Sequence, residues 1–100
     1  MNQSNDNYPA WEDSEKPEIM LRINMDDWSL LLSYACLEEA TWSKESTLKE
    51  GFLQLEFTFC SIKIVGTKLE ELLSHIQNHQ ISRINLVSPI KGITATKKVG

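Results

Sequence analysis

The sequence predicts a small α+β domain: an antiparallel sheet with a central β-hairpin at about residues 52–65, and one or two helices packed on one face. Two patterns support this fold class. Apolar and polar residues alternate strictly from Leu53 to Phe59, as expected for a half-buried strand. From Leu69 to Ile76 the apolar residues instead recur at spacings of three and four, as in an amphipathic helix. The two apolar faces would bury each other.

The first expected strand is Ile19–Asn24, in which every second residue from Ile19 to Ile23 is a branched apolar one. Asn and Asp residues follow it and supply turn and capping groups before Trp28.

The segment Trp28–Trp42 admits two interpretations. Its Leu, Ala and Glu residues favour a helix, and one helical face would hold both tryptophans. In the alternative, Tyr34–Trp42 is a strand that leads into the central hairpin, but the segment has a single β-branched residue, Thr41. We expect the helix, followed by a polar loop at Ser43–Gly51.

In the central hairpin the alternation changes parity after Phe59, because the next apolar residues are Ile62 and Ile64. A two-residue turn at 60–61 would restore the parity and pair Phe59 with Ile62. Phe57 would then lie opposite Ile64. Neither turn residue is Gly or Asn, which such turns favour. One continuous strand with a bulge at the same place is therefore the alternative.

The helix expected after the hairpin has recognisable start signals. Gly66 ends the sheet, Thr67 can act as N-cap, and Glu70 three residues later would complete a capping box. A last strand is expected at Ile81–Val87, which is rich in β-branched residues. If it runs parallel to the strand at 62–65, the helix forms a right-handed crossover.

The two ends of the chain are expected to be tails around a domain at residues 18–89. Residues 1–17 are polar and acidic and predict a disordered N-terminal tail, and residues 90–100 predict a flexible basic C-terminal tail. Tyr8 and Trp11 form a pair that could anchor the first tail to a protein partner. The alternative is that the pair packs loosely on its own domain.

Composition excludes several classes of protein. No apolar run approaches the roughly 20 residues that a membrane span needs. The two cysteines, without a signal peptide, do not form a disulfide framework. We therefore expect a cytoplasmic protein with no membrane association. Because the four glycines are isolated, the sequence has no glycine-rich phosphate loop.

Catalytic or metal chemistry has few candidates. His75 and His79 have the spacing of metal ligands on a helix, and Cys60 is the one residue that could join them as a third ligand or as a nucleophile. No Glu follows in the H-E-x-x-H manner, and no oxyanion-binding group is recognisable. We expect no catalytic residues, no metal, no cofactor and no enzymatic activity.

The charge is unevenly distributed along the chain. Residues 1–71 hold all fourteen acidic residues and six of the ten basic ones, whereas residues 72–100 hold four basic residues and no acidic one. This asymmetry predicts either end-to-end pairing between chains or an anion-attracting C-terminal region. The candidate nucleic-acid contacts are Arg83, Lys91, Lys97 and Lys98.

A helix, an apolar strand and an I-K-G turn follow one another between Leu69 and Gly92. This segment resembles the opening of the bacterial Sm-like RNA chaperones, and the resemblance implies RNA binding. Weak RNA or DNA binding is therefore the alternative function, with an affinity that falls steeply as salt is added.

The main expectation is a non-enzymatic protein-interaction or regulatory module that associates with itself, as a homodimer, or with a protein partner. A sheet that is covered on one face leaves free edges. The strands that begin at Ile19 and Ile81 are the expected pairing edges.

Overall fold

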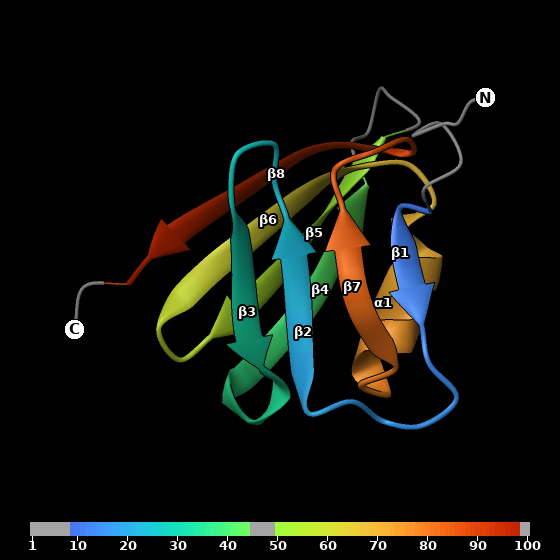
Figure 1. Ribbon diagram of the computed structural model, residues 1–100. Coiled ribbons are helices and arrows are strands. Elements are labelled where there is room, and N and C mark those ends of the chain that lie inside the picture. Colours follow the sequence, from blue (N-terminus) through green and yellow to red (C-terminus); the bar gives the residue numbers. More distant parts are fainter. Residues whose placement is uncertain (1–8, 45–49, 99–100) are drawn as a thin grey trace.

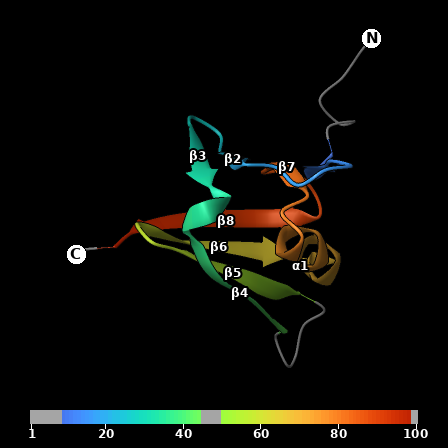
Figure 2. The same cartoon turned by 90° about the horizontal axis from the view of Figure 1, so that it is seen from below.

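The computed structural model describes residues 9–44 and 50–98 of the chain. Two four-stranded sheets form two layers, and one α-helix lies between them at one side (Figures 1 and 2). We call β1–β7–β2–β3 sheet 1 and β4–β5–β6–β8 sheet 2. The described part of the chain is thus mostly β with a single α-helix, which confirms the α+β class in its broad sense.

Sheet 1 combines segments that lie far apart in the sequence. Strands β2 (Met20–Asn24) and β3 (Ser29–Ser33) form an antiparallel hairpin, and β7 (Ile81–Asn85) pairs parallel to β2. The short strand β1 (Trp11–Asp13) adds to β7 in the antiparallel direction. The strand predicted at residues 19–24 is confirmed as β2, except that Ile19 precedes it and is 79% exposed.

Sheet 2 is antiparallel throughout. Its strands, in sheet order, are β4 (Leu37–Lys44), β5 (Gly51–Phe57), β6 (Cys60–Gly66) and β8 (Ile90–Lys97).

The β5–β6 pair is the predicted central hairpin, but the expected turn at 60–61 is wrong. Leu55 lies opposite Ile62, so that the two turn residues are Thr58 and Phe59. The backbone N–H of Thr58 donates a 2.8 Å hydrogen bond to the carbonyl of Cys36, which holds the turn against the start of β4. As a result Phe59 points out of the core. The alternative of one continuous, bulged strand is also excluded.

The helix predicted for residues 28–42 is wrong. The segment instead contains β3, the 3₁₀ turn η2 (Tyr34–Cys36) and β4. Because β3 pairs along its length with β2, and β4 with β5, ladder hydrogen bonds and packing outweigh the small difference in intrinsic propensity. The alternative, a strand leading into the hairpin, is correct from Leu37 onward.

Helix α1 (Leu69–Gln77) buries the stripe formed by Leu69, Leu72 and Ile76. The predicted N-cap at Thr67 is wrong: the N-cap is Lys68, in the left-handed conformation (φ 62°), and no side chain caps the helix. The helix contacts β4, β5 and β7, so it fills one open side between the sheets rather than covering an outer face (Figure 2).

Strand β7 follows α1 but belongs to the other sheet from β6. The expected parallel pairing with residues 62–65 is therefore wrong, and the helix connects the two layers instead of crossing over within one. The parallel neighbour of β7 is β2, with Asn24 opposite Asn85.

The structure also differs from expectation at the two ends. Within the expected N-terminal tail, β1 is held to β7 by Asn85, whose backbone N–H and side-chain Nδ2 donate to the carbonyls of Ala10 (2.7 Å) and Pro9 (2.8 Å). Within the expected C-terminal tail, residues 90–97 form β8, which pairs with β6. Residues 1–8, 99 and 100 lie outside the described residues.

The core is one cluster shared by both sheets and the helix. Each fully buried side chain contributes about 1.5–3 kcal/mol to the free energy of unfolding. Among the described residues, no helix is long and apolar enough to span a bilayer. The largest fully buried side chains are Leu21, Ile23, Ile81 and Ile84 in sheet 1, Leu53, Leu55, Phe57, Ile62 and Ile64 in sheet 2, and Leu69, Leu72 and Ile76 in α1.

Candidate functional site

The side of the molecule away from α1 carries an apolar groove. Strand β3 is an edge of sheet 1 and β8 is an edge of sheet 2, and a cavity of about 310 Å³ opens beside them. We call it the β3–β8 groove. It is lined by Trp28, Leu30 and Leu32 from sheet 1 and by Phe59, Cys60, Ala95, Thr96 and Lys97 from sheet 2.

The wall from sheet 1 follows from strand alternation. Leu30 and Leu32 share the inward face of β3 and pack against the core. They are only partly buried, since β3 has no strand on its other side. Trp28 has the same parity and stands just before the strand. The Met25 N–H donates a 2.8 Å hydrogen bond to the Trp28 carbonyl, which closes the β2–β3 turn. The Trp28 side chain is left 51% exposed.

The wall from sheet 2 is built at the tip of the β5–β6 hairpin. Phe59 stands in the turn and is 71% exposed, whereas Cys60 behind it is buried. Ala95 of β8 lies opposite Ile62 and completes the apolar surface. Burial raises the pKa of the Cys60 thiol, so the reactive thiolate form is disfavoured.

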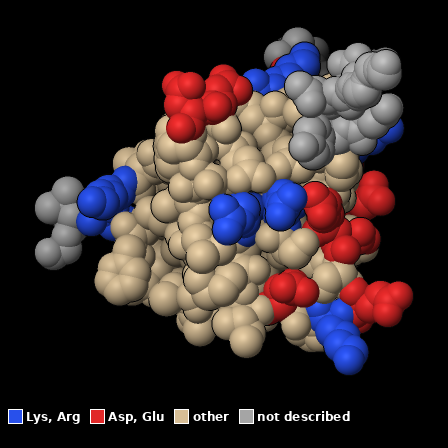
Figure 3. Space-filling view, in the orientation of Figure 1, with Lys and Arg blue, Asp and Glu red and all other residues tan. Residues whose placement is uncertain are grey.

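Charged residues lie at two separate places beside the groove. Asp26 and Asp27 are exposed in the β2–β3 turn next to Trp28, and Lys97 lines the groove at the end of β8. Figure 3 shows acidic side chains over that turn and basic ones at the end of β8, with uncharged surface between them. Among the described residues, Lys97 takes part in no ion pair.

A polar network lies on the outer face of sheet 2, opposite the core-facing residues of β5. Glu56 accepts hydrogen bonds from the Ser61 hydroxyl and from Gln54 Nε2 (2.8 Å), and Lys98 Nζ lies 3.1 Å from its Oε1. The hydrogen bond from Ser61 is the largest of several effects that lower the pKa of Glu56 to about 2. A carboxylate held so firmly ionised is a poor general acid or base at neutral pH. The network therefore fixes the hairpin rather than supplying catalysis.

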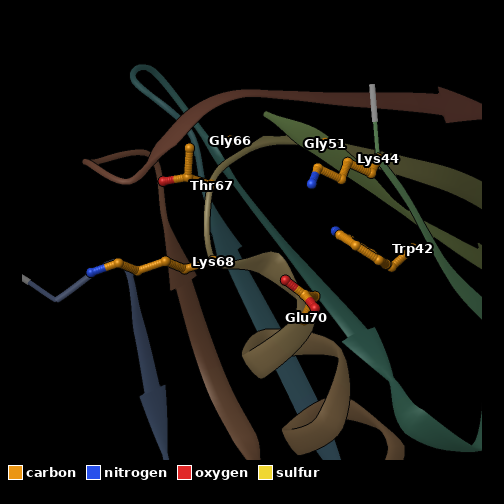
Figure 4. Close-up of a pocket in the computed structure, with 7 residues that line it drawn as sticks. All are labelled: Trp42, Lys44, Gly51, Gly66, Thr67, Lys68 and Glu70. Atoms are coloured by element: carbon orange, nitrogen blue, oxygen red, sulfur yellow. The ribbon is translucent and has the colours of Figure 1, made fainter. Parts of the chain in front are cut away.

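A second hollow of about 190 Å³ lies at the start of α1 and is mainly polar. Figure 4 shows Glu70, from the first turn of the helix, on the side of the hollow that faces Trp42, and Lys68 extending away from both. A carboxylate in this position repels anions, so the helix start does not form a phosphate site. The hollow is lined by Trp42, Lys44, Gly51, Gly66, Thr67, Lys68 and Glu70.

The two histidines considered as metal ligands, His75 and His79, contact different residues. His75 Nε2 lies 3.9 Å from Asp13 Oδ2, whereas the His79 ring stacks on Tyr34 at 4.5 Å between centroids. His79 also ends the helix: it has φ 57°, its N–H donates to the Ile76 carbonyl, and the next N–H donates to the His75 carbonyl. This is a Schellman motif. Across residues 9–44 and 50–98, no group of three or more His, Cys, Asp or Glu side chains could hold a metal.

Tyr34, which supports His79, is itself buried. Its hydroxyl donates a 2.6 Å hydrogen bond to the carbonyl of Ile81. Burial raises the pKa of Tyr34 to about 12, so the hydroxyl keeps its proton at neutral pH. Tyr34 and His79 together therefore join the η2 turn to the end of the helix.

The four basic residues proposed as nucleic-acid contacts do not form one patch. Arg83 is on sheet 1, and its Nη1 lies 3.4 Å from Oε2 of Glu12. Lys91, near the start of β8, pairs with Glu50. Lys97 is the last residue of β8 and Lys98 follows it, so both lie ~20 Å from Lys91 along the strand. Carboxylates pair with three of the four side chains, and Lys97 alone lines the groove.

The predicted partner contacts are also placed differently. Trp11 lies in β1 opposite Ile84 and packs against the core, and Tyr8 is outside the described residues. The strands that begin near Ile19 and Ile81 are β2 and β7, and each has a neighbour on both sides. The expectation that they form the free edges is wrong. In the described chain the edge strands are β1, β3, β4 and β8.

Sequence reasoning missed the groove because it placed Phe59 in the core and Trp28 on a helix. No signal in the sequence identifies it, because alternation permits a turn at 58–59 or at 60–61, and only the first leaves Phe59 outside the core.

Comparisons with protein-family models, curated proteins and solved structures find no match to this chain. The segment Leu69–Gly92, from which RNA binding was expected, contains α1, β7 and the start of β8. These two strands belong to different sheets, so the helix does not lead into one continuous sheet.

Proposed function

We propose that the protein is a non-enzymatic interaction module that binds a protein surface through the β3–β8 groove. The observation that carries this proposal is the exposure of two aromatic side chains, Trp28 and Phe59, on opposite walls of one apolar cavity. Aromatic residues around a desolvated pocket dominate the energetics of protein interfaces. Single apolar residues are common on protein surfaces and do not indicate a binding site, whereas a contiguous apolar patch does.

The chemistry of the groove favours a protein over a polar small molecule. Its lining offers three polar groups, the Trp28 indole N–H, the Thr96 hydroxyl and the Lys97 ammonium, beside an otherwise apolar surface. Small polar ligands require several converging polar groups. Apolar side chains of a partner need only the shape and the apolar walls that the groove provides.

The backbone beside the groove supports the same proposal. Strand β3 reads SLLLS, contains no charged residue or proline, and is an edge of sheet 1. Soluble proteins usually protect such edges with charges, prolines or bulges. An unprotected edge next to an apolar groove is suited to main-chain pairing with a partner strand.

The absence of enzymatic activity is part of this proposal. The thiol of Cys60 is buried, which raises its pKa and disfavours the thiolate, and the Glu56 carboxylate is bound in its network. Cys36 and Cys60 are both free cysteines, which is in keeping with the reducing cytoplasm.

Site-specific photo-crosslinking tests the groove as a binding surface. We expect Phe59 replaced by p-benzoylphenylalanine to give crosslinked protein adducts in cells on irradiation. The matched control carries the same probe at Thr41, which is exposed on β4 at the opposite edge of sheet 2. Adducts of equal intensity from both positions, or from neither, would contradict the proposal.

A further inference from the structure

Building on the proposed function, we infer that the partner bound by the β3–β8 groove is the same groove of a second copy of this chain. The protein then forms a two-fold symmetric dimer in which Phe59 of each copy enters the cavity of the other. The inference rests on the shape and on the charge of this one surface.

The shape is self-complementary. Phe59 projects from the rim with 71% of its surface exposed, directly beside a cavity of about 310 Å³ whose other walls are Leu30, Leu32 and Ala95. In a two-fold contact, if one residue meets a site on the partner, the partner's residue meets the same site in return. A projecting ring next to a cavity of suitable size satisfies this condition. Both rings would be buried by a single interface.

The charge is self-complementary as well. One end of the surface carries Asp26 and Asp27, and the other carries Lys97, with uncharged residues between them (Figure 3). A two-fold axis through the middle of the groove brings the acidic end of each copy to the basic end of the other. Within the described part of its own chain Lys97 has no carboxylate partner. A partner that contributes only apolar side chains would not pair with these aspartates or with Lys97.

The neighbouring charges do not compete for this role. Lys98 is already paired with Glu56 and Glu38 on its own chain. Lys97 is therefore the basic group available to a partner, and complementary charges across an interface set its orientation and exclude other registers.

A charge-exchange experiment tests the dimer. The masses of the full chain and of the variants Asp27→Lys and Lys97→Glu are measured by light scattering across a dilution series. We expect the unmodified protein to be dimeric. Each variant should have its dimer dissociation constant raised at least tenfold, since in both two-fold contacts Lys97 then faces a lysine at position 27, or Asp27 faces a glutamate at position 97. An equimolar mixture of the two variants should restore dimer, because both contacts in the mixed pair join opposite charges.

The control is Glu39→Lys, which reverses an exposed charge on β4 and should leave the dissociation constant unchanged. Restoration in the mixture also demonstrates that both variants are folded. Equal dimer in all samples would show that another surface mediates association, and a monomeric unmodified protein would overturn the inference outright. If the protein is monomeric but still crosslinks to another protein from position 59, the proposal that the groove binds a protein is supported. Only the inference that the partner is a second copy of the chain is then contradicted. A monomeric protein that also gives no crosslinked adducts from position 59 would contradict both the proposed function and the inferred dimer.

Discussion

At the scale of single residues, Gly66 at the end of β6 shows how closely this strand approaches the chain that enters β8. A Cβ atom at this position would collide with the carbonyl oxygen of Pro89, just before β8, and lie 3.0 Å from Cα of Ile90, the first residue of β8. We expect Gly66→Ala to lower the free energy of unfolding by about 1–3 kcal/mol, because two backbones would have to separate. Urea denaturation measures the loss.

Gly92 provides the matched control for Gly66. It lies on the neighbouring strand β8, and a Cβ atom there would meet nothing within 4 Å. Gly92→Ala should therefore leave stability unchanged or raise it by about 0.5–1 kcal/mol, since alanine restricts the unfolded chain. Equal destabilisation by both substitutions would show that close approach at Gly66 is not the cause.

Glu56 makes the stability of the protein depend on pH. Its folded pKa, about 2, is below its ordinary value of 4.5, so the stabilisation is fully present above pH 4.5 and is lost as the pH falls towards 2. We expect Glu56→Gln to lower the melting temperature at pH 6 and to differ little from the unmodified protein near pH 2. Melting temperatures from pH 2 to 7 measure this.

Glu15→Gln serves as the control for Glu56→Gln, since it removes an exposed carboxylate that lies before β2, outside sheet 2. A Glu56→Gln deficit that stays constant across the whole pH range would mean that the Ser61 and Gln54 hydrogen bonds act without regard to charge.

Single residues also show what the sequence can predict. Alternation correctly identified the inward positions of β5 and β6, because side-chain direction has a period of two. It could not choose between turns at 58–59 and 60–61, since both preserve that parity. The hydrogen bond that decides between them joins Thr58 to Cys36, 22 residues away. The Lys98 N–H also donates a 3.0 Å hydrogen bond to the Phe59 carbonyl, so contacts distant in sequence fix the position of Phe59 and with it one wall of the groove.

At the scale of secondary-structure elements, α1 packs along one side of the molecule. Leu72 is fully buried, whereas its neighbour Leu73 is only partly so. We expect Leu72→Ala to lower the free energy of unfolding by about 2–5 kcal/mol, since it leaves a cavity between the sheets. Chemical denaturation should give a clearly smaller loss for Leu73→Ala. Similar losses would mean that the helix is rotated relative to the described packing.

Elements with a strong local pattern were predictable, and those without one were not. The periodicities of β2, β5, β6 and α1 are visible in the sequence. The segment 28–42 has the composition of a helix, yet it forms strands because β2 and β5 offer ladder partners. Propensity differences are below 1 kcal/mol per residue, and pairing with neighbouring strands readily exceeds them.

At the scale of the whole molecule, the arrangement in two sheets could not be predicted from local patterns. Alternation indicates that a strand exists but not which strand it joins, and β7 joins β2 and β1 rather than β6. Asn85 is the residue that connects these three strands, through Asn24 (2.8 Å), Pro9 and Ala10. The groove was unpredictable for the same reason, since it lies where edges of two different sheets meet.

The strand order of sheet 1 has a consequence for how the chain acquires its structure. Sheet 2 begins as a run of neighbours, β4, β5 and β6, each of which can pair as soon as the next is made. In sheet 1, Asn24 pairs with Asn85, which lies 61 residues further along the chain. Contacts between residues so far apart in sequence form slowly. The β4–β5–β6 meander should therefore form first and serve as the template. During synthesis, the β2–β3 hairpin cannot pair with β7 until residue 85 has left the ribosome. We therefore expect sheet 1 to be completed after the meander has formed.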